Sequence, residues 1–433
     1  MNRRWRARTT AVFLTLLVAA CTARAGTGPG GGDGQPRSPA PGASRSADGL
    51  PEGVSFRQSV HTLEDGSPVR IRVLTVRQDA RADVEAGHGG SVPGTDTVRE
   101  IARRAQAVAA VNGTFFDMDS ARYAGDPLGL YVSHGVLLSE AAGRRTALVL
   151  PGPGRRPRIA ELGSSTHVIS SDGARAGVDG TNRVPGRIVG CGGVGGDRLA
   201  GTGARTVAPL PGRVCFDPDE LVEFTAQWGG PTPSADRDSF EAVLDARAMV
   251  TALRSPAGGP VPRGGRALVG IGSGAAWLRE HATEGRTLTV SSRVTAPDGQ
   301  EVDLAGTSVL GAGPALVRAG RTWINAAANG VSPGAVRTRS PRTVAGIRAD
   351  GTLLLVVFDG RHPGVSEGVS LTEAAGIMVS MGAVDAMNLD GGGSSTMVVR
   401  DEVRNSPSDP GKTDDARQRK VSNALVVVPR QRP

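Results

Sequence analysis

Three consecutive glycines between a carboxylate and two hydroxyls place the strongest constraint on how this chain folds. The segment reads Asn388-Leu389-Asp390-Gly391-Gly392-Gly393-Ser394-Ser395-Thr396. Glycine loses the most backbone entropy on folding, so a run of glycines is retained where the backbone takes a positive φ or comes close to a ligand. Residues 383–389 can form a buried strand before this turn, and residues 397–399 the next strand after it. We therefore expect an Asn, an Asp and several free backbone N–H groups to crowd together at a strand end.

The N-terminus has the pattern of an export signal. Arginines within the first eight residues precede an apolar run from Ala11 to Ala20, and this run is shorter than the ~20 apolar residues that a membrane-spanning helix needs. Val18-Ala19-Ala20-Cys21 resembles the lipobox of bacterial lipoproteins. We therefore predict a signal peptide with a lipobox over residues 1–21, lipidation of Cys21, and anchoring at the outer face of the bacterial cell membrane. The alternative is cleavage after Ala23-Arg24-Ala25, which would give a secreted protein.

The segment after the signal differs sharply in composition from the rest of the chain. Residues 22–49 are almost wholly Gly, Pro, Ala, Ser and Arg, a composition that cannot bury enough apolar surface to fold. We predict that they form a disordered tether. Residues 50–433 alternate apolar runs with turn signals, which is typical of one large folded domain or two closely connected ones.

Export also decides how the remaining cysteines are interpreted. Cys191 and Cys215 form an even pair in an oxidising compartment, so we predict a disulfide between them. The alternative is two buried free thiols. The six histidines are scattered without the spacing of zinc ligands, which disfavours a zinc site.

The charge of the chain invites a nucleic-acid hypothesis that its composition does not support. The net charge is +8 and the pI is near 10.4. The arginines, however, are spread along the whole sequence, and only 3% of residues are aromatic, so platforms for base stacking are scarce. We expect no nucleic-acid partner and interpret the charge as general attraction to anionic polymers and lipids of a bacterial surface.

Periodicity predicts more strands than helices. Apolar runs bounded by turn signals predict strands at Pro68–Val76, Ala107–Val111, Gly129–Val132, Thr146–Leu150, Ala267–Ile271, Leu288–Val294, Leu353–Phe358 and Ala424–Val428. One helix is expected near residues 96–105, and another over Leu371–Met381, where Ser370 and Glu373 form a capping box. The elements do not alternate regularly. This pattern predicts an α+β fold with a mixed, largely antiparallel sheet and packed helices.

Two further polar clusters follow predicted strands. The first is Asn112-Gly113-Thr114-Phe115-Phe116-Asp117, which comes directly after an apolar strand. An Asn-Gly pair is usually a turn, but the two phenylalanines can pin this turn into the core while Asn112 and Asp117 point elsewhere. A plain turn and a functional site are equally consistent with these residues.

The second cluster extends from Pro341-Arg342-Thr343 to Asp359-Gly360-Arg361, with an Asp350-Gly351 hairpin signal between the two ends. Strands joined at this turn run antiparallel and bring Arg342 to the same end as Asp359 and Arg361. Arginine has a planar fork that fits phosphate in a bidentate way. The structural alternative is a surface turn with a weak ion pair.

Together these segments resemble the phosphodiester glycosidase family. The resemblance extends from about Val69 to Val428 and depends on the order and spacing of its pieces, which are residues 110–116, 311–317, 341–343, 359–361 and 388–395. It implies a phosphodiester glycosidase-like domain within residues 50–433. The chain departs from the family pattern at Thr114, where glycine is common, and in the Arg-rich middle region, residues 151–251.

The resemblance implies hydrolysis of the bond between a sugar anomeric carbon and a phosphate in glycan phosphodiesters. Phosphate leaves readily, so the site mainly has to stabilise its negative charge and the positive charge of the sugar ring. We expect the catalytic groups to be Asp359, Asp390, Arg342 and Arg361. We expect the substrate-binding groups to be Asn112, Asp117, Asn388, Gly391, Gly392, Gly393 and Ser394.

Two alternatives stay open. Asp and Asn oxygens in these clusters are also the ligands that Ca²⁺ or Mg²⁺ prefers, although the chemistry does not demand a cation if two arginines face the phosphate, and we expect no cofactor. The same residues could also form a non-catalytic binding module for phosphorylated cell-surface glycans. We favour the enzyme, because carboxylates beside a phosphate weaken binding, which a receptor does not tolerate well.

Overall fold

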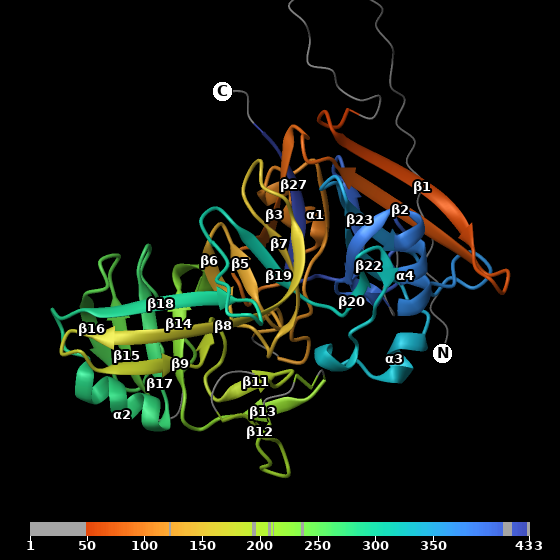
Figure 1. Ribbon diagram of the computed structural model, residues 1–433. Coiled ribbons are helices and arrows are strands. Elements are labelled where there is room, and N and C mark those ends of the chain that lie inside the picture. The colour runs from red at the N-terminus through yellow and green to blue at the C-terminus, as the bar shows by residue number, and fades with distance from the viewer. Residues whose placement is uncertain are drawn as a thin grey trace, which may run out of the picture. The chain divides into compact units, whose positions relative to one another are not determined.

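The computed structural model describes residues 49–120, 123–192, 196–206, 209–210, 212–234, 238–409 and 418–430 (Figure 1). The predicted signal peptide, the lipidation at Cys21 and all of the predicted tether except Gly49 lie outside these residues. Within them, no helix is long and apolar enough to cross a membrane.

A seven-stranded sheet carries most of the C-terminal motifs. Its order is β1-β2-β23-β22-β24-β20-β21. The strands are β1 (Val54–Thr62), β2 (Pro68–Val76), β20 (Ala315–Arg318), β21 (Arg321–Thr322), β22 (Arg342–Arg348), β23 (Leu353–Phe358) and β24 (Ala383–Asn388). The Asp350-Gly351 turn joins β22 to β23 in antiparallel register, with Arg342 opposite Phe358. Arg342 therefore lies beside the start of the Asp359-Gly360-Arg361 segment, as expected for this hairpin.

A second sheet brings the Asn112 cluster beside the Gly-rich loop. Its order is β26-β25-β4-β27-β3. The strands are β3 (Ala82–His88), β4 (Ala109–Asn112), β25 (Met397–Val399), β26 (Glu402–Val403) and β27 (Asn423–Pro429). Because β25 leaves the Gly-rich loop and pairs with β4, the strand that ends at Asn112, the two clusters lie at neighbouring strand ends.

A third sheet connects the motif region to the middle of the chain. Its main path is β18-β8-β7-β19-β5-β6, and β9 pairs with β8. The strands are β5 (Tyr131–Ser133), β6 (Val136–Ser139), β7 (Arg145–Leu150), β8 (Arg158–Ser170), β9 (Arg175–Val178), β18 (Leu288–Thr295) and β19 (Ser308–Gly311).

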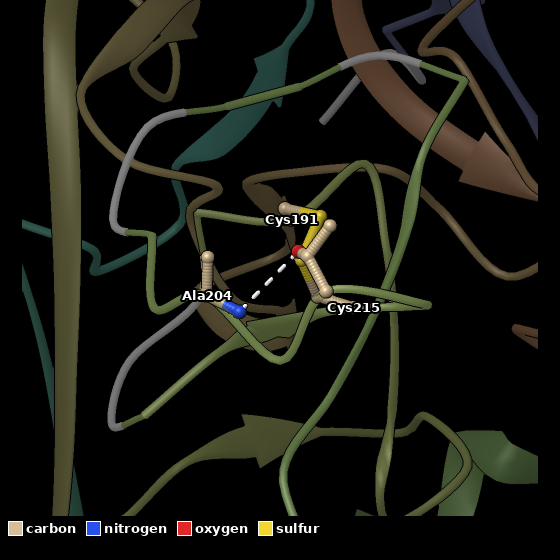
Figure 2. Close-up of a disulfide and its surroundings, with 4 residues drawn as sticks. Cys191, Ala204 and Cys215 are labelled. Carbon is tan, nitrogen blue, oxygen red and sulfur yellow. Dashed lines mark hydrogen bonds between the residues drawn. A yellow bond between two sulfur atoms is a disulfide. The ribbon is translucent and has the colours of Figure 1, made fainter.

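Two smaller sheets are built largely from the middle region. The five-stranded one has the order β10-β14-β17-β15-β16, and the three-stranded one has the order β11-β13-β12. The strands are β10 (Gly180–Thr181), β11 (Arg187–Val189), β12 (Arg198–Leu199), β13 (Val214–Phe216), β14 (Leu221–Thr225), β15 (Phe240–Leu244), β16 (Val250–Arg254) and β17 (Arg266–Gly270). Figure 2 shows the predicted disulfide, which joins Cys191 to Cys215 on β13 with the Cα atoms 5.3 Å apart. This prediction is confirmed.

The helices are short and lie against the sheets. The α-helices of the described chain are α1 (Val98–Arg104), α2 (Gly272–His281), α3 (Pro333–Arg337) and α4 (Leu371–Ser380), and its 3-10 turns are η1 (Ala226–Trp228), η2 (Ala327–Asn329) and η3 (Gly392–Ser394). The capping box expected at Ser370 and Glu373 is present at the start of α4. Leu371, Ala374 and Met378 of α4 pack against the outer face of the seven-stranded sheet, together with Val344 and Val356.

The main core lies between the motif-bearing sheets. Its buried side chains come from the seven-stranded sheet, the β4 sheet and the β7 sheet together, and they include Leu74, Val111, Leu148, Leu355 and Leu425. Because one core joins all three sheets, the strand ends that carry the motifs are held in fixed relative positions.

The predicted fold class is wrong, because the protein is mostly β, with several sheets and a curled half-barrel rather than a sheet with packed helices. The pairing is antiparallel in the described strands apart from the β10–β14 pair. The prediction failed mainly in the middle region, where strands such as β8 are half exposed and interrupted by small and polar residues. Such strands lack the apolar runs on which the sequence assignment depended.

Candidate active site

The Gly-rich loop is joined to both other clusters by backbone hydrogen bonds. The Leu389 N–H donates to the Thr343 carbonyl at 2.8 Å, and the Asp390 N–H donates to the Gly113 carbonyl at 3.0 Å. Three segments that are distant in the sequence are therefore assembled in one place.

Asn112 connects the three segments through its side chain. It is fully buried, and its Nδ2 donates to the Asp390 carbonyl at 2.7 Å. Its Oδ1 accepts hydrogen bonds from the Thr343 hydroxyl at 2.6 Å and from the Thr396 N–H at 3.1 Å. Since these atoms already have partners inside the protein, the geometry favours a positioning role for Asn112, and its predicted contact with substrate stays a prediction.

Each of the three glycines lets another group approach the loop closely. A Cβ on Gly391 would lie 3.0 Å from a neighbouring backbone oxygen. Gly392 has a φ of +61°, and a Cβ there would lie 3.1 Å from the Arg361 guanidinium. A Cβ on Gly393 would lie 2.6 Å from the Asp409 carboxylate. The run of glycines is thus explained by close contacts and one left-handed conformation.

The backbone donors of the loop are partly occupied. The Gly391 N–H donates to the Asp390 Oδ1 at 2.8 Å, and the Gly392 N–H donates to the Pro341 carbonyl at 2.8 Å. A phosphate that used these two donors would have to displace those contacts.

Four of the predicted site residues line a single cavity of about 530 Å³. They are Asp117, Arg342, Asn388 and Asp390. The cavity has the size and the mixture of apolar walls and few polar groups that is typical of a small-molecule site.

Asp390 is the carboxylate of the Gly-rich loop that faces this cavity. Burial raises the pKa of Asp390 to about 6, although the neighbouring Ser394 hydroxyl, the Gly391 N–H and the positive charge of Arg419 act in the opposite direction. A carboxylate with a pKa this close to neutrality is suited to exchange protons during a reaction.

Arg342 presents a guanidinium to the same cavity without a carboxylate partner in the described part of the chain. Its hydrogen bonds go to backbone carbonyls, of which the Thr338 oxygen at 3.0 Å is the nearest. Burial, and secondarily the positive charge of Arg361, lowers the pKa of Arg342 to about 10. The side chain is therefore still charged at neutral pH and keeps capacity for an anion.

Asp359 and Arg361 lie outside the lining of this cavity. Asp359 is buried, its Oδ1 accepts from the Ser406 N–H at 2.9 Å, and its Oδ2 lies 3.5 Å from Arg72 Nη2. Burial raises the pKa of Asp359. Arg361 is exposed and has a φ of 63°, a conformation that is uncommon for residues other than glycine. Their catalytic roles stay predictions, and Asp359 has the contacts of a residue that positions the segment at Ser406.

Asp117 links the motif region to the middle region. Its carboxylate, which is 2% exposed, pairs with the guanidinium of Arg187 on β11. The ion pair leaves Asp117 less free to contact a sugar than the sequence suggested, and its substrate-binding role stays a prediction.

Asn388 and the end of the Gly-rich loop carry buried polar atoms with unused capacity. Asn388 Nδ2 donates to the Gly313 carbonyl at 3.2 Å. In the described structure, Asn388 Oδ1 and the hydroxyls of Ser395 and Thr396 are buried without a hydrogen-bond partner. Unpaired buried polar atoms are costly and are uncommon away from functional sites.

Part of the chain is similar in sequence to known proteins. Residues 238–428 match the family model described as phosphodiester glycosidase. These residues are therefore similar in sequence to a phosphodiester glycosidase domain. The N-acetylglucosamine-1-phosphodiester alpha-N-acetylglucosaminidase of Bos taurus is 36% identical over 100 residues, which is 23% of this chain and 19% of that protein. The matched part thus spans between 11% and 19% of the length of the first curated relatives.

Two solved structures resemble the chain over most of its length. A candidate exported protein from Burkholderia pseudomallei has a TM-score of 0.73 and 32% identity, covering 84% of this chain and 75% of its own. A protein from Synechocystis has a TM-score of 0.65 and 23% identity, covering 87% of this chain and 62% of its own. The second likeness shows the fold alone.

The matched residues contain some of the predicted site residues and omit others. Arg342, Asn388 and Asp390 lie within the matched residues 238–428, whereas Asn112 and Asp117 lie before them. The middle region between residue 151 and residue 237 also lies outside the match.

Sequence reasoning missed two arginines of the cavity wall. Arg145, at the start of β7, and Arg419 both line the cavity. Arg419 pairs with Asp409 at 2.6 Å. No motif surrounds either residue. The one available signal was that Arg145 directly precedes the predicted strand Thr146–Leu150, because a charged side chain beside a buried strand is uncommon.

The structure offers no obvious metal centre in the residues that it describes. No group of three or more His, Cys, Asp or Glu side chains there is arranged to hold an ion. Of the two aspartates in the donor set that the sequence suggested for Ca²⁺ or Mg²⁺, Asp390 lines the cavity and Asp359 does not. The alternative of a bound metal ion stays a prediction.

Proposed function

We propose that this protein is an exported hydrolase that cleaves the bond between a sugar anomeric carbon and a phosphate in glycan phosphodiesters. One observation carries the proposal. The Asp390 carboxylate, which has a pKa of about 6, and the Arg342 guanidinium, which has no carboxylate partner in the described structure, line the same cavity. A carboxylate that titrates near neutrality and a cation with no carboxylate partner are the two groups that this reaction needs.

The chemistry assigns a task to each group. Arg342 binds the non-bridging phosphate oxygens through its planar fork, which stabilises the negative charge that grows as the leaving phosphomonoester takes the electron pair of the breaking carbon–oxygen bond. Asp390 in its ionised form either accepts a proton from the attacking water or bonds to the anomeric carbon. The stereochemistry of the released sugar distinguishes these two steps.

The same geometry favours an enzyme over a binding module for phosphorylated glycans. An ionised carboxylate in a cavity that receives a phosphate repels that ligand, which costs affinity. The cost is useful only if the carboxylate acts in the transition state. Asp390→Asn should therefore abolish turnover and keep or tighten ligand binding.

The location of the protein is part of the proposal. Support comes from the N-terminal sequence, from the disulfide between Cys191 and Cys215, which suits an oxidising compartment, and from the likeness to a candidate exported protein. We propose attachment to the outer face of the cell membrane through a lipid on Cys21. Mass spectrometry of the N-terminal peptide from membranes tests this, and a peptide that begins at Gly26 would instead show a secreted protein.

The decisive experiment incubates the purified protein with a panel of sugar 1-phosphodiesters. We expect release of free sugar and of a phosphomonoester from at least one member, and loss of both products with Asp390→Asn. Absence of release with folded protein, together with tight binding of the diesters, would support the binding module instead.

A further inference from the structure

Arg145 is a buried cation that the proposed reaction does not use. It begins β7, lines the cavity and is 7% exposed. Its Nε is buried without a hydrogen-bond partner, and the described structure contains no ion pair to its guanidinium. The guanidinium carbon lies 5.3 Å from the centre of the Phe115 ring. This cation–π contact fixes the side chain but supplies no hydrogen-bond acceptor.

Other buried arginines of the protein are neutralised by carboxylates. Arg183 pairs with both Glu140 and Glu220, and Arg72 lies 3.5 Å from Asp359. Burial of an unpaired charge is costly, and removing water from a guanidinium without an anion loses several hydrogen bonds. Burial lowers the pKa of Arg145 to about 10, so the side chain remains charged at neutral pH. The site is therefore built to receive an anion from solution.

Arg145 and Arg342 occupy separate places on the cavity wall. Arg342 begins β22 of the seven-stranded sheet, whereas Arg145 begins β7 of another sheet and lies against the Phe115 ring. A phosphodiester carries a single negative charge, which Arg342 alone can neutralise.

We propose that the cavity takes a substrate with a second anionic group, a carboxylate or a phosphate, and that Arg145 binds this group. The inference rests on the function proposed above. The second anion can belong to the released sugar, as in a uronic acid, or to the alcohol part of the phosphodiester, as in an anionic repeating polymer. Phe115 contacts the Arg145 guanidinium, and further apolar residues line the cavity. A less polar surrounding strengthens an ionic contact.

The test compares two matched pairs of phosphodiesters built on the sugar that is released fastest in the panel. In one pair the sugar C6 is either a carboxylate or a hydroxymethyl group. In the other pair the alcohol is either glyceric acid or glycerol. We expect the wild-type protein to prefer the charged member of one pair by about tenfold or more in kcat/KM, the effect of a hydrogen bond to a charged group.

Variants at neighbouring arginines provide the control. Arg145→Gln should reduce this preference to about one, and Arg145→Lys should retain part of it, because lysine keeps the charge and loses the planar fork. Arg144→Gln removes the same charge from the adjacent exposed residue and should leave the preference as in the wild type. Thermal unfolding of each variant verifies that it is folded.

The outcomes distinguish failure of the second-anion site from failure of the proposed function. Hydrolysis with no preference in either pair, or a preference that survives in Arg145→Gln, overturns the second-anion site and leaves the glycosidase standing. If no diester of the panel is hydrolysed, the proposed function fails. The same two pairs are then built on one sugar of the panel, and titration calorimetry with these four compounds decides the inference. Binding that favours a charged member and depends on Arg145 supports it, and equal or absent binding overturns it.

Discussion

The motif loops and the middle region contribute to the same cavity in different ways. Arg342, Asn388 and Asp390 come from strand ends in the matched family domain and supply charge and hydrogen-bonding groups. Val189 and Gly190 come from the middle region and form part of the cavity wall, but they have no charged or hydrogen-bonding side chains. The motif loops are held by backbone hydrogen bonds between distant segments, whereas the part of the middle region at the cavity is held by a small three-stranded sheet and the disulfide between Cys191 and Cys215.

For the proposed function, this difference separates the residues that would carry out the reaction from the residues that would set its selectivity. Groups that act on the anomeric bond need fixed geometry, which a shared core and interlocked loops provide. A wall that sets which substrate fits can change with little effect on the reacting groups. The contrast between the two regions can be tested by variants that act on one region at a time.

The largest effect is expected at Asp390. Asp390→Asn should reduce kcat about a thousandfold, because proton transfer or attack by this carboxylate is lost. Binding of an uncleaved phosphodiester should be equal or tighter, since a negative charge beside the phosphate is removed. Steady-state kinetics and calorimetry measure the two effects. In the wild type, kcat/KM should fall as the pH drops below about 6, where Asp390 becomes protonated.

Asp385→Asn is the matched control for this prediction. Asp385 lies on the same strand, β24, and contacts Arg318 rather than the cavity. Its variant should keep the wild-type kcat. A kcat for Asp390→Asn within tenfold of the wild type would remove Asp390 from the reaction and move the catalytic role to another carboxylate.

Loss of the disulfide should act on the other region. The Cys191→Ala, Cys215→Ala double variant should lower the free energy of unfolding by about 3 kcal/mol in the chain-entropy model, measured by urea denaturation. It should change the ratio of kcat/KM between substrates more than kcat itself, because only the wall is loosened. Equal stability, or a uniform loss of kcat on all substrates, would contradict the division between the two regions.

The ion pair between Asp117 and Arg187 should couple the regions. Asp117→Asn and Arg187→Gln each remove one partner of a contact in which Asp117 is buried. A double-mutant cycle on the free energy of unfolding should give a coupling of about 1–2 kcal/mol. A coupling near zero would mean that the wall does not depend on this contact.

A further effect concerns stability and again involves Asp390. Burial raises its pKa in the folded protein from 3.8 to about 6, so the folded state binds the proton more tightly than the unfolded state. Stability therefore falls as the pH rises from about 4 to 6 through this group. At pH 7, Asp390→Asn should be more stable than the wild type by at most about 3 kcal/mol, and the difference should be small near pH 4. Denaturation at the two pH values measures it, and a variant that is less stable at pH 7 contradicts the assignment.

Local patterns predicted the elements around the site well. β2 and β23 have the expected bounds, the capping box at Ser370 is present, and the predicted disulfide forms. These features depend on residues close in sequence or on cysteine count, which a single chain displays directly. The fold class was wrong because strands of the middle region owe their existence to partners such as β18, which pairs with β8 from far away in the sequence.

The candidate site was predictable in its motifs and only partly in its geometry. Arg342 and Asp390 line the cavity together, but Asp359 is paired with Arg72 away from it. Asp359 and Asp390 are both Asp-Gly segments after apolar strands, so no local signal distinguishes them. No sequence motif marks Arg145 as a site residue, because its importance comes from burial without a carboxylate partner. Such burial is a property of its surroundings in the folded protein.

The sequence by itself determined the position of the Gly-rich loop, the hairpin at Asp350-Gly351 and the cysteine pair. Steric freedom, turn geometry and redox chemistry are local properties. Only the tertiary structure decided which charges meet. The pKa of Asp390 and the isolation of Arg145 arise from desolvation in a shared cavity, and desolvation depends on every segment that closes around a group.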